Sequence, residues 1–208
     1  MVGASSGWAL GAWLLIQLTA LGLCAMRAAF WARVPRAGEQ LALYVMLAVQ
    51  VGASAMLFPL LLRNVRWTIF AIAAAWPLGE LAAFLADVPM RRFAQAEWFV
   101  TLWLVTLYLW SRVLRTQWMR ICGAAVAAMV CLGGPVLWYL RLEFHEVGRK
   151  PQICELANYG PITAAISQCI TDAFWPASWA WSLIPMIFAL FSIWMSIRCD
   201  RRREPIHK

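Results

Sequence analysis

The chain has 208 residues, of which 63% are hydrophobic and only 13% are charged, and its formal net charge is +8. Soluble domains carry about 25% charged residues to cover their surface, so this composition excludes a water-soluble globular protein. The arginines stand at the ends of apolar stretches, where they contact lipid headgroups, and no basic face is interleaved with aromatic residues. This pattern argues against nucleic acid as a partner.

Six stretches are long and apolar enough to cross a bilayer, which takes roughly twenty residues. They are expected to be helices, because a helix satisfies its own backbone hydrogen bonds in lipid. We therefore predict an all-α fold, a polytopic integral membrane helical bundle of about six transmembrane helices in one domain, 1–208. The predicted spans are 8–26, 41–62, 67–86, 98–114, 121–140 and 174–197, with an outer loop at 141–173.

The orientation is predicted from the basic residues. The densest basic cluster is the C-terminal tail, 198–203, which is expected in the cytoplasm. An even number of spans then places the N-terminus in the cytoplasm as well, and a bacterial inner membrane is the expected location. The bias is shallow, because ten basic residues fall inside and eight outside. Among the fourteen tryptophans, Trp13, Trp76 and Trp103 lie deep in the predicted spans and are expected to be packing or pocket residues.

The outer loop contains two cysteines, Cys154 and Cys169. In an oxidising compartment they would close a loop of about sixteen residues, worth roughly 3 kcal/mol in the chain-entropy model. Two separate thiols are the alternative. The apolar stretch 162–170 of the same loop is predicted to form a short helix on the membrane surface.

Glu80 is the most conspicuous polar residue within the predicted spans. It follows Pro77 and Gly79, which weaken the helix before it. A carboxylate in the bilayer is costly and usually faces the bundle interior or water, so Glu80 is a candidate intramembrane site for a proton or substrate. Asp87 lies seven residues further, on roughly the same helical face, and Arg91 another turn on. The alternative is structural, with Glu80 pairing with an outer arginine or a neighbouring helix.

Three further features predict sites of bending or binding. Pro77, the run Gly133, Gly134 and Pro135, and Pro185 are candidate helix kinks, which line binding sites in some transporters and have no function in many other membrane proteins. An outer group of arginines is a candidate contact for an anionic lipid or substrate, because arginine suits phosphate and carboxylate geometry. Non-specific phospholipid contact is the alternative. This group comprises Arg27, Arg33, Arg36 and Arg92, with Arg91 beside them.

Known catalytic motifs are absent from the sequence. The two histidines, His145 and His207, lie outside the predicted helices, so paired haem or metal ligands within the membrane are excluded. No P-loop, dinucleotide fingerprint or nucleophile elbow occurs. We expect no catalytic residue, no metal and no cofactor, which makes a non-enzymatic role the first interpretation.

Three functional hypotheses remain. The first is a non-catalytic integral membrane subunit of a larger complex: a scaffold, an anchor or a permease partner. The second is a small transporter or channel-like protein that uses an intramembrane carboxylate, and the third is a membrane enzyme that acts on lipids. The expected partners are membrane lipids, and either other membrane subunits or further copies of the chain.

Overall fold

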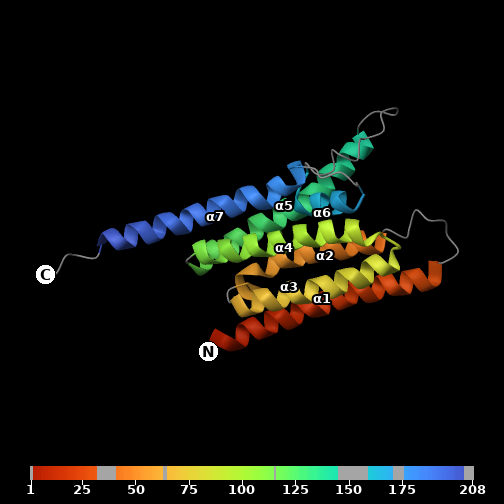
Figure 1. Cartoon of the computed structure of the whole chain (residues 1–208), viewed down its shortest axis with the longest axis horizontal. Coiled ribbons are helices and arrows are strands. Elements are labelled where there is room, and N and C mark those ends of the chain that lie inside the picture. The colour runs from red at the N-terminus through yellow and green to blue at the C-terminus, as the bar shows by residue number, and fades with distance from the viewer. Residues whose placement is uncertain are drawn as a thin grey trace.

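The computed structural model describes residues 2–31, 41–62, 65–114, 116–144, 159–170 and 176–203. These residues are all-α, and they form seven helices, six of them long (Figure 1). Each long helix covers one of the six predicted stretches. The helices are α1 (Val2–Trp31), α2 (Leu41–Leu61), α3 (Val65–Leu85), α4 (Met90–Val113), α5 (Gln117–Phe144), α6 (Pro161–Ile170) and α7 (Pro176–Arg203).

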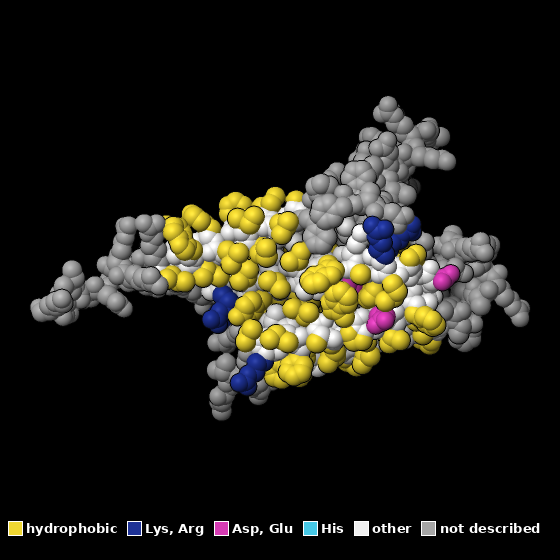
Figure 2. Space-filling view, viewed as in Figure 1, with side chains coloured by type: hydrophobic (Ala, Val, Ile, Leu, Met, Phe, Trp, Pro, Cys, Tyr) yellow, Lys and Arg dark blue, Asp and Glu magenta, His cyan; other side chains and the backbone are white. Residues whose placement is uncertain are grey.

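Four of these helices are long and apolar enough to cross a membrane: Gly7–Met26, Ala42–Leu61, Val65–Leu85 and Gln117–Leu137. Four such helices in one chain are typical of a multi-pass integral membrane protein. Figure 2 shows apolar side chains over most of the visible face, with Lys and Arg side chains toward the ends of the helices. Large apolar side chains are exposed on this surface, among them Phe84 and Trp118. Such a surface suits lipid and would aggregate in water.

The first four helices pack together through α2 and α3. Helix α1 packs against α2 and α3, and α4 packs against the same two helices. The buried face of α3 is a stripe of small residues, which allows neighbouring backbones to approach closely. This stripe consists of Thr68, Ala71, Ala75, Gly79, Ala82 and Ala83.

Indole and amide groups form hydrogen bonds between these helices. Trp13 Nε1 on α1 donates to Ser54 Oγ on α2 (3.1 Å), and Trp103 Nε1 on α4 donates to the carbonyl of Val51 on α2 (3.3 Å). Both indoles are buried, as expected for deep packing residues. Buried polar groups need such partners because lipid offers none.

Local hydrogen bonds define the end of α3 and the start of α5. After α3, the N–H groups of Asp87 and Val88 donate back to the carbonyls of Phe84 and Ala83, at 3.3 and 3.1 Å. Asp87 has φ 49°, so the turn is a Schellman motif with an aspartate at the position that glycine usually occupies. Before α5, Thr116 Oγ1 accepts a hydrogen bond from the N–H of Met119 (3.2 Å) and caps the helix.

The short helix α6 is packed inside the bundle. It contacts α2, α4, α5 and α7, and Figure 1 shows it beside α5, away from both marked termini. Its side chains from Ile162 to Ala165 are buried. The expected helix is therefore present, but its placement on the membrane surface was wrong. Four surrounding helices cover its apolar side chains, so it has no need to lie on lipid.

Two glycines make the contact between α5 and the start of α6 possible. A Cβ atom at Gly134 would lie 2.7 Å from the backbone oxygen of Tyr159, and one at Gly160 would lie 3.0 Å from the oxygen of Val130. Backbone therefore meets backbone here, with no room for a side chain. Gly133, by contrast, has no atom within 4 Å of the corresponding position.

The candidate kink residues all lie within continuous helices. Pro77 is inside α3, Pro135 inside α5 and Pro185 inside α7, and Pro59 is inside α2. No helix is interrupted at these prolines. The two adjacent glycines therefore differ in role, since only Gly134 contacts residues 159 and 160.

We predict that Gly134→Ala destabilises the protein, because the added methyl group collides with the backbone at Tyr159. Overpacking of this kind costs about 1–3 kcal/mol. Thermal unfolding of the purified protein in detergent is the measurement, and Gly133→Ala is the matched control that should melt like the wild type. Equal melting temperatures for the two variants would contradict the contact.

Candidate functional site

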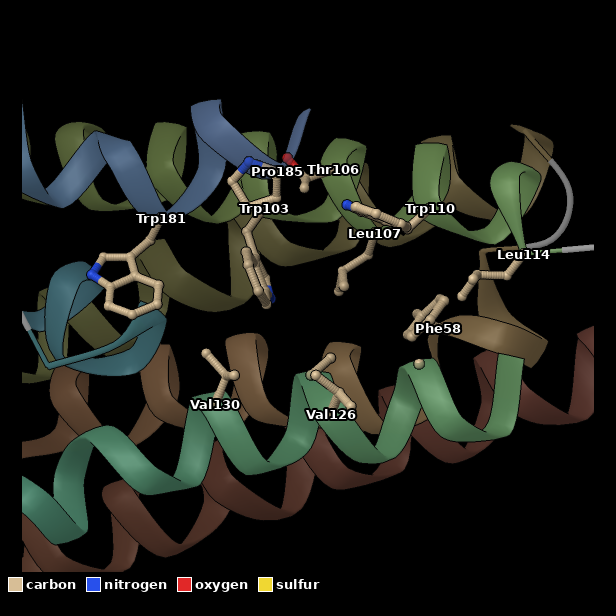
Figure 3. Close-up of a pocket in the computed structure, with 12 residues that line it drawn as sticks. Phe58, Trp103, Thr106, Leu107, Trp110, Leu114, Val126, Val130, Trp181 and Pro185 are labelled. Atoms are coloured by element: carbon tan, nitrogen blue, oxygen red, sulfur yellow. The ribbon is translucent and has the colours of Figure 1, made fainter. Parts of the chain in front are cut away.

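A pocket of about 390 Å³ lies between α4, α5 and α7, with α2 behind it (Figure 3). It exists because α5 makes its main contacts with α2 and α6, whereas α7 makes its main contacts with α4 and α6. The space between α4 and α5 is left open. The volume falls within the range of about 300–1,000 Å³ that is usual for ligand pockets.

The pocket is lined almost wholly by aromatic and aliphatic side chains. Figure 3 shows Trp103 projecting from α4 toward Val126 and Val130 on α5, with Trp181 at one end and Phe58 at the other. The lining residues are Phe58, Trp103, Thr106, Leu107, Trp110, Leu114, Gly123, Val126, Ala127, Val130, Trp181 and Pro185.

Two polar groups of the lining are already engaged in the protein. The Thr106 hydroxyl lies within 2.8 Å of the Leu102 carbonyl and 3.1 Å of the Ser182 carbonyl, so it ties α4 to α7. The Trp103 indole N–H is used on Val51. The pocket thus offers surface for dispersion contacts and little for hydrogen bonding, which suits a hydrocarbon group.

The predicted residue Glu80 is exposed on α3, on the outside of the bundle. Its neighbour Gly79 takes the buried position instead. Asp87 is exposed in the turn after α3, and Arg91 is exposed on the first turn of α4. The expectation that these three residues follow one helical face was wrong, because α3 ends at Leu85. Arg92 is half-buried on α4.

Arg33, Arg36 and Cys154 lie outside the described residues, as do the side chains of Arg27 and Cys169. The disulfide therefore stays a prediction. The cysteine side chains that are described, Cys24, Cys122 and Cys131, are thiols.

The polar residue that the sequence interpretation missed is Glu97 on α4. Its side chain has no exposed surface, and neither carboxyl oxygen has a hydrogen-bond partner among the described residues. A Cβ atom at Gly79 would collide with this carboxyl group and with the ring of Phe93, so the three residues are in close contact. Within the described part of the chain, no group of three or more His, Cys, Asp or Glu side chains is arranged to hold a metal ion.

Aromatic side chains pack near Glu97. Trp76 on α3 packs edge-on against Phe93 and Trp98 on α4, with ring centroids 6.1 and 5.8 Å apart. The Trp76 indole donates to Thr101 Oγ1 (3.1 Å). The aromatic rings and Gly79 therefore surround the carboxyl group where α3 packs against α4.

No family model matches the chain, and no curated protein or solved structure matches it significantly.

We predict that Asp87→Gly raises the melting temperature, because a left-handed backbone costs an L-residue roughly 1–2 kcal/mol and glycine nothing. Asp87→Val, which cannot relieve that strain, should lower the stability by about 1 kcal/mol. Thermal unfolding of both variants tests this capping role. A glycine variant less stable than the wild type would show that the Asp87 carboxylate itself stabilises the fold.

Proposed function

We propose that this protein is a non-catalytic integral membrane protein that binds the hydrocarbon chain of a membrane lipid between α4, α5 and α7. The observation that carries the proposal is the apolar, tryptophan-lined pocket of about 390 Å³. Its Thr106 hydroxyl and Trp103 indole are turned to partners in the protein, so neither is offered to a polar headgroup. The expected role within a larger membrane complex is compatible with such a binding subunit.

The proposal includes six membrane spans, adding α4 and α7 to the four apolar helices. Helix α4 has 24 residues and packs against α2 and α3, both of which are candidate spans. Helix α7 contains the apolar stretch Ala180–Met195 and packs along α4. At 1.5 Å per residue, 24 residues extend about 36 Å, enough for the hydrocarbon core. The cytoplasmic placement of both termini is part of the same proposal.

A lipid chain is the favoured occupant for a physical reason. Between apolar protein and lipid there is no hydrophobic driving force, so affinity depends on shape and packing. An empty pocket would deprive the lining of dispersion contacts, and rigid tryptophan rings provide large surfaces at low entropic cost. Trp103, Trp110 and Trp181 supply three such surfaces here.

A second candidate function is a small transporter that uses an intramembrane carboxylate. The observation in its favour is Glu97, which is buried in the bundle without a partner among the described residues. Glu80, the carboxylate suggested by the sequence, is exposed on α3. If the protein is a transporter, Glu97 is the carboxylate to test first.

We predict that Ala127→Trp weakens lipid retention at least tenfold, which corresponds to about 1.4 kcal/mol. Ala127 is half-buried and lines the pocket, so an indole there fills it. Native mass spectrometry after exchange into a lipid-free detergent measures the lipid that remains bound. The wild type should retain one lipid per chain.

Ala125→Trp is the control, since Ala125 lies two residues away on the same helix, is exposed and does not line the pocket. This variant should retain lipid like the wild type. Equal loss in both variants, or a wild type that retains no lipid, would overturn the proposal and leave ordinary contact with bulk lipid.

A further inference from the structure

The starting observation is a set of buried oxygen atoms without partners in the α1–α4 part of the bundle. Neither Glu97 nor Gln50 has any exposed surface. Both carboxyl oxygens of Glu97 and the side-chain oxygen of Gln50 have no hydrogen-bond partner among the described residues. Such groups are rare in folded proteins, and each calls for an explanation such as an ion or a water molecule.

Gln50 on α2 is the buried polar side chain beside Glu97. Its side-chain nitrogen donates to the carbonyl of Ala75 on α3 (3.0 Å). Because a carbonyl oxygen can only accept, the amide cannot be turned the other way, and its Oε1 remains available. The side chain of Gln50 also lies beside the Glu97 carboxyl group. Polar side chains from two helices, α2 and α4, therefore meet at one location.

Gln17 on α1 extends the set. Trp13 on α1 is hydrogen-bonded to Ser54 on α2, and the two helices are consecutive and antiparallel (Figure 1). Gln17 is one turn after Trp13, and Gln50 is one turn before Ser54, so the two glutamines lie at the same level of the bundle. Gln17 is buried, and both its amide atoms lack partners within the described ranges.

Among the described residues, no charged side chain balances Glu97. Helix α2 carries no Asp, Glu, Lys or Arg, and on α3 both Arg66 and Glu80 are exposed. On α4 the nearest charged residues are Arg91 and Arg92 in its first turn. Helix α6 has no charged residue, and those of α7 are confined to 198–203. No ion pair to Glu97 occurs in the described part of the chain.

We propose that Glu97, with Gln50 beside it, forms a binding site for one monovalent cation, a proton or an alkali metal ion, that exchanges with water. A buried carboxylate is too costly to remain charged alone, so it needs one positive charge and no more. Oxygen atoms of carboxylate and amide groups are the ligands that hard cations prefer. A divalent ion would leave an unbalanced charge in the apolar interior.

Glu97 lies near one end of the bundle. It lies seven residues after Met90, the first residue of α4, or about 10 Å along the helix from the α3–α4 turn. Asp87 and Arg91 are exposed at that end. A cation therefore has about two helical turns to cross between water and the carboxyl group. This inference is independent of the lipid pocket, whose lining does not include Glu97.

Reaction with dicyclohexylcarbodiimide tests the site in the whole protein in detergent. This apolar reagent adds to a protonated carboxyl group and gives a stable N-acylurea, which peptide mass spectrometry locates. We expect Glu97 to be labelled increasingly as the pH falls. Glu80, which is exposed on the adjacent helix, serves as the internal control for reagent activity.

Sodium chloride, compared with choline chloride at equal ionic strength, separates the two possible cations. Protection of Glu97 by sodium, several-fold or more, identifies an alkali metal site, whereas labelling that depends on pH and is indifferent to sodium identifies a proton site. Either result supports the proposal. Labelling of Glu80 with none of Glu97 at any pH, or labelling of Glu97 that depends on neither pH nor sodium, would overturn it.

A pair of variants gives a second measurement. Glu97→Gln is a neutral isostere, so its melting temperature should be independent of pH and sodium over the range in which that of the wild type shifts, because a bound cation stabilises only the folded protein that holds it. Glu80→Gln should behave like the wild type. If Glu97→Gln does not fold, the labelling of the wild type decides the question.

Discussion

The contact between α5 and the start of α6 governs the arrangement of the second half of the chain. Gly134 and Gly160 let the two backbones approach without side chains between them. With α6 held there, α5 and α7 both pack against it, and the two helices are kept apart along the rest of their length. The pocket is the space that remains between these two helices. Trp181 and Pro185 of α7 lie on one side of it, and Val126 and Val130 of α5 lie on the other.

Six helical stretches could be predicted from hydropathy alone, because lipid leaves a long apolar segment no alternative to a helix. The structure bears out each stretch as a helix. Which residues face inward was harder to predict, because an apolar helix in lipid has no polar face to mark its outside. On α3 the informative signal is the stripe of small residues that includes Ala75 and Gly79. Glu80 lies next to this stripe, outside the closest packing.

Glu97 was missed because the predicted span began after it. The first two turns of α4 contain Arg91, Arg92 and Gln95 as well as Glu97, which together resemble a loop. In the structure these turns are helical, and Phe93, Ala96 and Glu97 are buried. The partner of this face, Gly79, belongs to another helix. No pattern within α4 alone could therefore have shown that a carboxyl group is buried there.

The burial of α6 was equally hidden from local analysis. A ten-residue apolar helix inside a polar loop suits the membrane surface when it is considered alone. Its burial follows from four other helices that leave a place for it, and from glycines in two segments about 26 residues apart in the chain. Such a contact depends on the tertiary arrangement, which hydropathy along the chain does not encode.

The pocket and the buried carboxyl group share one interface, that of α2 with α4. Gln50, beside Glu97, is followed by Val51, whose carbonyl accepts the indole N–H of Trp103. Trp103 in turn forms a wall of the pocket. The same turn of α2 therefore contacts both places. The carbonyl that orients this indole is therefore held by the residue next to Gln50, so the packing of α2 on α4 positions both the wall of the pocket and the side chain beside Glu97.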